Sequence, residues 1–129
     1  MTGFGHIDLR VSDIVLAEAF YDELLPALGF TRRYHHGEAW RVWAKADPPL
    51  PATPYFAITE SRRHRPNESR IAFWVASREE VERVAAIVSN CGGRDVSGPN
   101  EMPYGPGYYA VFFADPSGNP LEVYLRPPE

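Results

Sequence analysis

The sequence predicts an α+β fold in which one unit, strand–helix–strand–strand–strand, occurs twice. The first observation is an alternating apolar strand pattern at residues 5–11 that reappears at 69–75. The second is that each copy runs into a helix-capping residue and an amphipathic helix that ends at glycine. The third is a constant offset of 64 residues, which relates the two strands and also takes Gly29 to Gly93. The repeat therefore extends through the helices and indicates a duplicated module.

Composition restricts the class of protein and its partners. A chain of 129 residues, 44% hydrophobic and 23% charged, suits one globular domain over 1–129, with modules at about 1–61 and 69–129 and a linker at about 62–68. The net charge of −4 argues against nucleic acid or an anionic membrane as a partner. No apolar run approaches the roughly 20 residues that span a bilayer, and no signal-peptide pattern precedes the first strand. Cys91 is the only cysteine, which favours a reducing, cytoplasmic setting.

The first module begins with strand 5–11 and its helix. Ser12 or Asp13 can cap this helix, and Gly29 ends it. Its apolar residues recur at helical spacing and form a core-facing stripe. The stripe consists of Ala17, Phe20, Tyr21, Leu24, Leu25 and Leu28. Three short strands are predicted next, at 31–36, 39–46 and 54–60.

The second module repeats this order. Ser77 and Glu80 match a capping box, and the helix that follows ends at Gly92-Gly93. Its apolar stripe consists of Val81, Val84, Ala85 and Val88. The later strands are predicted at 107–114 and 120–126, joined by a turn at 115–119. The stretch 99–107, rich in proline and glycine, is predicted to be a loop, either a structural connection or a cover for a binding site.

Strand alternation places charged and aromatic side chains on one face of the sheet. If the apolar residues face the helices, the residues between them face the other way. Those residues are His6, Asp8, Arg10, Arg70, Trp74, Glu122, Tyr124 and Arg126. Two interpretations stay open on this evidence: a solvated outer face, or the lining of a binding site.

Several motifs resemble the vicinal oxygen chelate superfamily, which contains glyoxalase I, bleomycin-resistance proteins and extradiol dioxygenases. They are Gly5-His6-Ile7-Asp8-Leu9, Phe20-Tyr21 followed by Leu28-Gly29-Phe30, and Gly107-Tyr108-Tyr109-Ala110 followed by Asp115-Pro116-Ser117-Gly118-Asn119-Pro120-Leu121-Glu122. The resemblance covers nearly the whole chain. It implies two βαβββ modules that form a curved mixed β-sheet around a cleft, a small-molecule ligand, and often a homodimer.

The resemblance also implies a divalent metal site, which this sequence matches only in part. Of four expected ligand positions, two fall on His6 and Glu122, the third falls on Arg70, and the fourth falls near 56–58, where no side chain can ligate. Arginine is a permanent cation without a lone pair to donate, so we expect an Arg70–Glu122 ion pair in place of the metal. The prediction is therefore no cofactor, with Zn, Ni, Mn or Fe as the alternative.

Two functions follow from these residues. The first is a protein that binds a small aromatic or anionic molecule in the cleft through seven residues: Asp8, Arg10, Trp43, Arg70, Trp74, Tyr104 and Tyr124. The second is a metal-dependent lyase, isomerase or dioxygenase that uses His6 and Glu122 as metal ligands. No catalytic residue is assigned. Arg70 and the apolar stretch 56–58 favour the binding protein.

Overall fold

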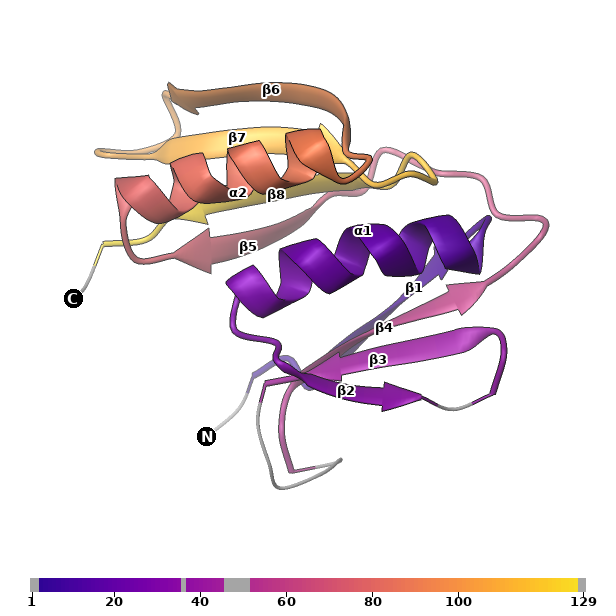
Figure 1. Cartoon of the computed structure of the whole chain (residues 1–129). Coiled ribbons are helices and arrows are strands. Elements are labelled where there is room, and N and C mark those ends of the chain that lie inside the picture. The colour runs from indigo at the N-terminus through magenta and orange to yellow at the C-terminus, as the bar shows by residue number, and fades with distance from the viewer. Residues whose placement is uncertain (1–2, 36, 46–51, 128–129) are drawn as a thin grey trace. The chain divides into compact units, whose positions relative to one another are not determined.

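The computed structural model describes residues 3–35, 37–45 and 52–127. The chain divides into two compact units, residues 1–65 and 66–129. Within the described residues each unit has one helix and one four-stranded mixed sheet, so the predicted pair of βαβββ modules is confirmed (Figure 1). No helix in the described part of the chain is long and apolar enough to cross a membrane.

The first unit contains β1 (His6–Val11), α1 (Ile14–Ala27), β2 (Arg32–His35), β3 (Trp40–Ala44) and β4 (Tyr55–Glu60). The strand order is β1-β4-β3-β2, and β1 runs parallel to β4 while the other pairs are antiparallel. Two parallel neighbouring strands need a crossover connection between them. Helix α1 is the first element of the connection from β1 to β4, and it covers one face of the sheet. That face is therefore the apolar one.

Helix α1 begins where two carboxylates satisfy its first backbone N–H groups. Asp13 is the N-cap and accepts hydrogen bonds from the N–H groups of Val15 and Leu16. The Glu60 carboxylate, at the end of β4, accepts from the N–H of Ile14 at 2.9 Å. The start of the helix is thus tied to the end of a strand 46 residues later in the chain.

The core of the first unit lies between α1 and its sheet. The helix contributes the predicted stripe, which is fully buried at Ala17, Phe20, Tyr21, Leu24 and Leu25. The opposing sheet face contributes Val11, Trp43, Phe56 and Ile58, each at most 1% exposed. All four belong to one face of the sheet by register, as alternation requires.

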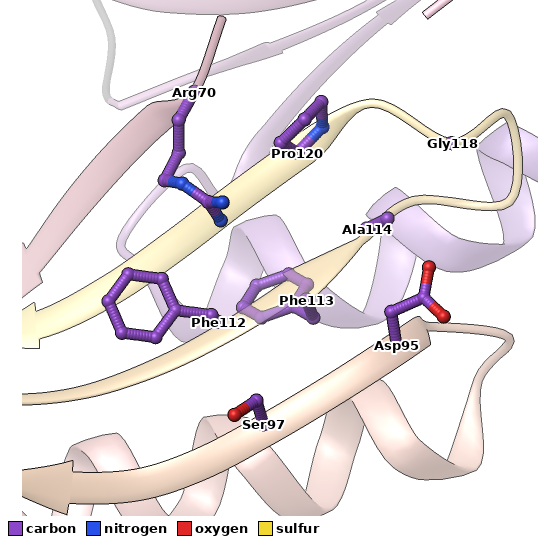
Figure 2. A pocket seen from close by; sticks show the side chains of 8 residues that line it. All are labelled: Arg70, Asp95, Ser97, Phe112, Phe113, Ala114, Gly118 and Pro120. Atoms are coloured by element: carbon purple, nitrogen blue, oxygen red, sulfur yellow. The ribbon is translucent and has the colours of Figure 1, made fainter. Parts of the chain in front are cut away.

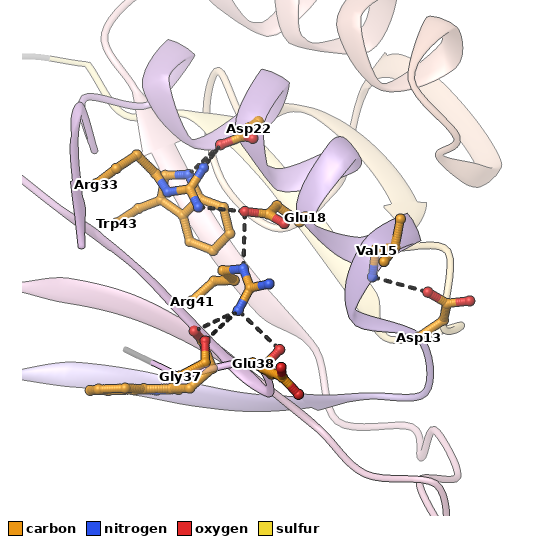
Figure 3. Close-up of polar contacts among 10 residues, drawn as sticks. Asp13, Val15, Glu18, Asp22, Arg33, Gly37, Glu38, Arg41 and Trp43 are labelled. Carbon is orange, nitrogen blue, oxygen red and sulfur yellow. Dashed lines mark hydrogen bonds and ion pairs between the residues drawn. The ribbon is translucent and has the colours of Figure 1, made fainter. Parts of the chain in front are cut away.

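Two arginines and two carboxylates join α1 to strands β2 and β3 (Figure 3). Glu18 lies 2.6 Å from Arg33 Nη2 and 3.0 Å from Arg41 Nε, the second contact being an ion pair without hydrogen-bond geometry. Asp22 pairs with Arg33 and accepts from the indole N–H of Trp43 at 3.0 Å. Burial opposes ionisation of Glu18, but the hydrogen bond from Arg33 and the positive charges of Arg33 and Arg41 prevail and lower its pKa.

The second unit contains β5 (Ile71–Val75), α2 (Arg78–Asn90), β6 (Arg94–Glu101), β7 (Tyr109–Ala114) and β8 (Pro120–Leu125), in the strand order β5-β8-β7-β6. Strand β5 is parallel to β8, which repeats the arrangement of the first unit. Ser77 caps α2 by accepting from the N–H of Glu80, whose carboxylate accepts from the N–H of Ala76. The predicted capping box therefore forms, with Ala76 as the donor to the carboxylate.

Strand β6 corrects the sequence prediction, which placed no strand at 94–101 and began a loop at Pro99. The strand continues to Glu101 as the edge of its sheet. Its pairing with β7 shifts register twice, between Arg94 and Ser97 and between Ser97 and Asn100. These irregularities, together with a Gly-Pro step, hide the alternation that identifies a strand, and an edge position tolerates them.

We predict that Glu18→Gln lowers the free energy of unfolding at pH 7 by about 2 kcal/mol, because Arg41 keeps its charge in a buried position and loses its ionic partner. Since folding lowers the pKa of Glu18, its contribution is complete above the ordinary value of 4.5 and is lost as the pH falls through the folded value. Urea denaturation should therefore show the difference from wild type shrinking below pH 4.5. Glu23→Gln, an exposed site on the same helix, is the control; an equal effect there would contradict the role of the network.

Candidate functional site

The sheet of the second unit has one face covered by α2 and one that is not. Leu121, Val123 and Val111 are fully buried on the face that meets the apolar stripe of α2. The strand register places a different set on the other face, which we call the open face. Its members include Ala72, Trp74, Ala110, Phe112, Ala114, Pro120, Glu122 and Tyr124, with Arg70 just before β5.

A cavity of about 330 Å³ lies at one end of this unit's sheet (Figure 2). All its lining residues belong to the second unit: Arg70, Asp95, Ser97, Phe112, Phe113, Ala114, Gly118 and Pro120. The volume is at the lower end of the roughly 300–1,000 Å³ found for small-molecule sites. The lining combines a cation, an anion, a hydroxyl group and aromatic carbon.

Arg70 is the cation of the cavity. Its Nη1 donates to the carbonyl oxygen of Leu121 at 3.2 Å, and its guanidinium carbon lies 5.0 Å from the ring centroid of Phe112. The expected Arg70–Glu122 ion pair does not form. Among the described residues, no carboxylate pairs with Arg70.

Glu122 instead accepts a hydrogen bond from the hydroxyl group of Tyr108. The glutamate is 6% exposed. Burial of Tyr108 and its hydrogen bond to Glu122 raise the pKa of the phenol, so it stays protonated. The Tyr108 ring stacks on Tyr124 with 4.9 Å between centroids, and Tyr104 meets Tyr108 edge-on at 5.2 Å. The three tyrosines therefore form one aromatic cluster, and Tyr108 is the member that contacts the buried carboxylate.

Comparison with known families identifies the chain. The model of the glyoxalase/bleomycin resistance protein/dioxygenase superfamily matches residues 3–123. The chain belongs to this superfamily. The comparison with curated proteins returned no match.

Solved structures with similar folds include members of the same superfamily. A glyoxalase/bleomycin resistance protein from Albidiferax ferrireducens T118 is 24% identical, with a TM-score of 0.74 over 96% of this chain and 98% of its own. The fosfomycin resistance protein FosX from Mesorhizobium loti is 15% identical (TM-score 0.69, coverage 98% and 93%). FosX from Listeria monocytogenes is 19% identical (TM-score 0.69, coverage 100% and 94%). At these identities the likeness concerns the fold.

The superfamily often uses divalent metals, and the residues at the matching positions of the second unit do not fit one. A protein metal site commonly needs three or more donors. At these positions of the second unit, Glu122 is the only side chain that could ligate a metal. Arg70 brings a positive charge, and the Glu122 carboxylate already accepts a hydrogen bond from the Tyr108 hydroxyl. Across the described residues, no group of three or more His, Cys, Asp or Glu side chains is placed to hold a metal ion.

The site residues predicted in the first unit are engaged locally. His6 is exposed, and its ring stacks on Tyr55 with 4.3 Å between centroids. Asp8 accepts from Arg10 at 2.8 Å and from the Thr59 hydroxyl at 2.9 Å. These side chains share the face of the first sheet that α1 does not cover.

The structure corrects the placement of Trp43. The sequence analysis placed it in the ligand cleft, but it lies on the face covered by α1 and is fully buried. Its ring packs near Tyr21, with the Arg33 guanidinium carbon 4.5 Å from its centroid. No ligand can stack on a ring enclosed in this way.

Two other predicted aromatic residues are accessible. Trp74 is 51% exposed, with the Arg126 guanidinium carbon 5.0 Å from its ring centroid, and Tyr104 is 63% exposed. Four further residues at this site were not predicted from the sequence: Phe112, Tyr108, Asp95 and Ser97. Alternation with the buried Phe113 could have revealed Phe112, whereas Asp95 and Ser97 lie on a strand that was not predicted.

The turn between β7 and β8 shapes one wall of the cavity. Asp115 is fully buried and accepts from the N–H of Ser117 at 2.8 Å and of Asn119 at 3.0 Å. Its second oxygen accepts from Asn119 Nδ2 at 2.9 Å. Gly118 has a φ of +87°, which favours glycine, and lines the cavity with Pro120.

We predict that Asp115→Ala lowers the free energy of unfolding by about 3 kcal/mol, because three N–H donors in a buried turn lose their acceptor. Urea denaturation measures the loss. Glu23→Ala, an exposed change on α1, should stay within about 0.5 kcal/mol of wild type. A similarly small effect of Asp115→Ala would show that the turn does not depend on this carboxylate.

Proposed function

We propose that this superfamily member binds a small molecule with an anionic group and an aromatic or other apolar part in the cavity of the second unit. The observation that carries the proposal is Arg70, a cation that lines a cavity and has no carboxylate partner among the described residues. A guanidinium group offers several N–H donors in one plane and matches a carboxylate or phosphonate.

The apolar residues that line the cavity support the proposal that the ligand has an aromatic or other apolar part. Phe112, Ala114 and Pro120 provide carbon surface around the guanidinium group. The guanidinium lies near Phe112 and donates to the Leu121 carbonyl, and these two contacts favour its position beside the apolar lining before a ligand arrives. Such a site favours an anion that carries an apolar group over a fully hydrated inorganic anion.

The alternative is a divalent-metal-dependent lyase, isomerase or dioxygenase. The observation that favours it is Glu122, a buried carboxylate hydrogen-bonded to Tyr108 at a position where the superfamily resemblance expects a metal ligand. A carboxylate and a phenol in contact can also hold or move a proton. Homodimerisation and a cytoplasmic location stay predictions from the sequence.

Arg70→Gln should weaken binding of 3-phenylpropanoate at least about tenfold, because a charge-assisted hydrogen bond to the carboxylate is lost. Isothermal titration calorimetry measures the affinity, with 3-phenylpropanol as the uncharged probe. The control is Arg83→Gln, an exposed arginine on α2. Bleomycin and fosfomycin belong in the same series, since the matching family and similar structures carry these names. Equal affinity of wild type and Arg70→Gln would contradict the proposal.

We predict that wild-type protein takes up no stoichiometric Zn, Ni, Mn or Fe and that Arg70→His raises the affinity for these metals, because it adds an imidazole on the face that carries Glu122. Measuring the metal content of the purified proteins, and their thermal stability with each metal added, tests this prediction. Stoichiometric metal in wild-type protein that is lost in Glu122→Gln would establish the alternative function. Unchanged affinity in Arg70→His would show that residue 70 does not face Glu122.

A further inference from the structure

The cavity of the second unit carries a negative charge as well as a positive one. Asp95 lines it from β6, and Arg70 lines it from the position just before β5 (Figure 2). In this view the Asp95 carboxylate is turned to the side away from Arg70 and Phe112, and the Arg70 guanidinium extends over β8. The two charged residues belong to different segments of the unit, Asp95 to β6 and Arg70 to the residues just before β5.

Neither charge is neutralised by a neighbour. Arg70 contacts the Leu121 carbonyl and the Phe112 ring, and among the described residues Asp95 has no ion-pair partner. They do not form an ion pair with each other, although both line the same 330 Å³. By contrast, Glu101 on the same strand as Asp95 pairs with Arg78 at 3.1 Å. The cavity therefore presents two exposed charges of opposite sign, neither of which has an ion-pair partner among the described residues.

Apolar and hydroxyl groups complete the lining. Phe112 supplies aromatic carbon from β7, and Ser97 supplies a hydroxyl group from β6. A ligand that carries only an anion would be attracted by Arg70 and repelled by Asp95. A ligand that carries only a cation would be attracted by Asp95 and repelled by Arg70. A molecule with both charges and an apolar part matches the whole lining.

We infer that the ligand is a small zwitterion of the amino-acid class, whose carboxylate faces Arg70 and whose protonated amine faces Asp95. This inference rests on the proposed function and specifies its ligand. The ligand's apolar side chain contacts Phe112 and its neighbours. Asp95 is thus a specificity-determining residue, which selects against simple carboxylic acids that Arg70 alone would accept.

Three probes of similar size and one phenyl ring test the inference: L-phenylalanine, 3-phenylpropanoate and 2-phenylethylamine. Calorimetry at low ionic strength should show L-phenylalanine binding wild-type protein about fivefold or more tighter than 3-phenylpropanoate, which lacks the amine. The amine without a carboxylate should bind more weakly than L-phenylalanine. Added salt should reduce the preference for the zwitterion.

Asp95→Asn should abolish the preference for L-phenylalanine and leave 3-phenylpropanoate binding unchanged or tighter. Asn suits this site because Asp95 has a φ of +53°, a left-handed conformation that asparagine adopts readily. Glu101→Gln removes the same charge from the other end of β6, outside the cavity lining, and should keep the preference.

The outcomes separate the two proposals. If 3-phenylpropanoate binds through Arg70 as tightly as L-phenylalanine, or if Asp95→Asn keeps the preference, the zwitterion inference is overturned and the proposed function stands. If no probe binds, or if Arg70→Gln binds all three as wild type does, the proposed function fails and the inference fails with it.

Discussion

The parallel pairing of the first and last strands of each module is the constraint on which the structure depends. It joins β1 to β4 and β5 to β8, segments about 50 residues apart, and requires a crossover that places the helix on one face of each sheet. Along each strand, the alternate side chains that face the helix therefore form the core. Those of the other parity, together with the groups at strand ends, are left for polar and ligand contacts.

The parallel pairing of β5 with β8 determines which side chains lie on the open face of the second sheet. Arg70 precedes β5 and reaches the carbonyl of Leu121 on β8, while the side chain of Glu122 turns to Tyr108. The carboxylate thus has a hydrogen-bond partner other than Arg70, and the guanidinium group has N–H donors beyond the one that contacts the Leu121 carbonyl. At this position the described residues place a cation beside aromatic carbon.

Periodicity predicted the features that depend on local pattern: both helices, their caps, the first and last strands of each module, and the parity of His6, Arg70 and Glu122. Periodicity did not predict features that depend on how the strands pair with one another. Strand β6 carries register shifts that mask its alternation, and the face on which Trp43 lies depends on its register with β4. Charge complementarity alone suggested a pair between Arg70 and Glu122, whereas a nearby carbonyl and phenol supply better-placed partners.

The central claim is that the Arg70 guanidinium group is the anion anchor of a ligand cavity on the open face of the second sheet. The most direct measurement is nuclear magnetic resonance of the arginine Nε–H groups and aromatic rings during titration with 3-phenylpropanoate. The account predicts saturable shifts of the Arg70 Nε–H and the Phe112 ring, with the Arg83 Nε–H unchanged. Saturable binding that leaves Arg70 and Phe112 unshifted would contradict it.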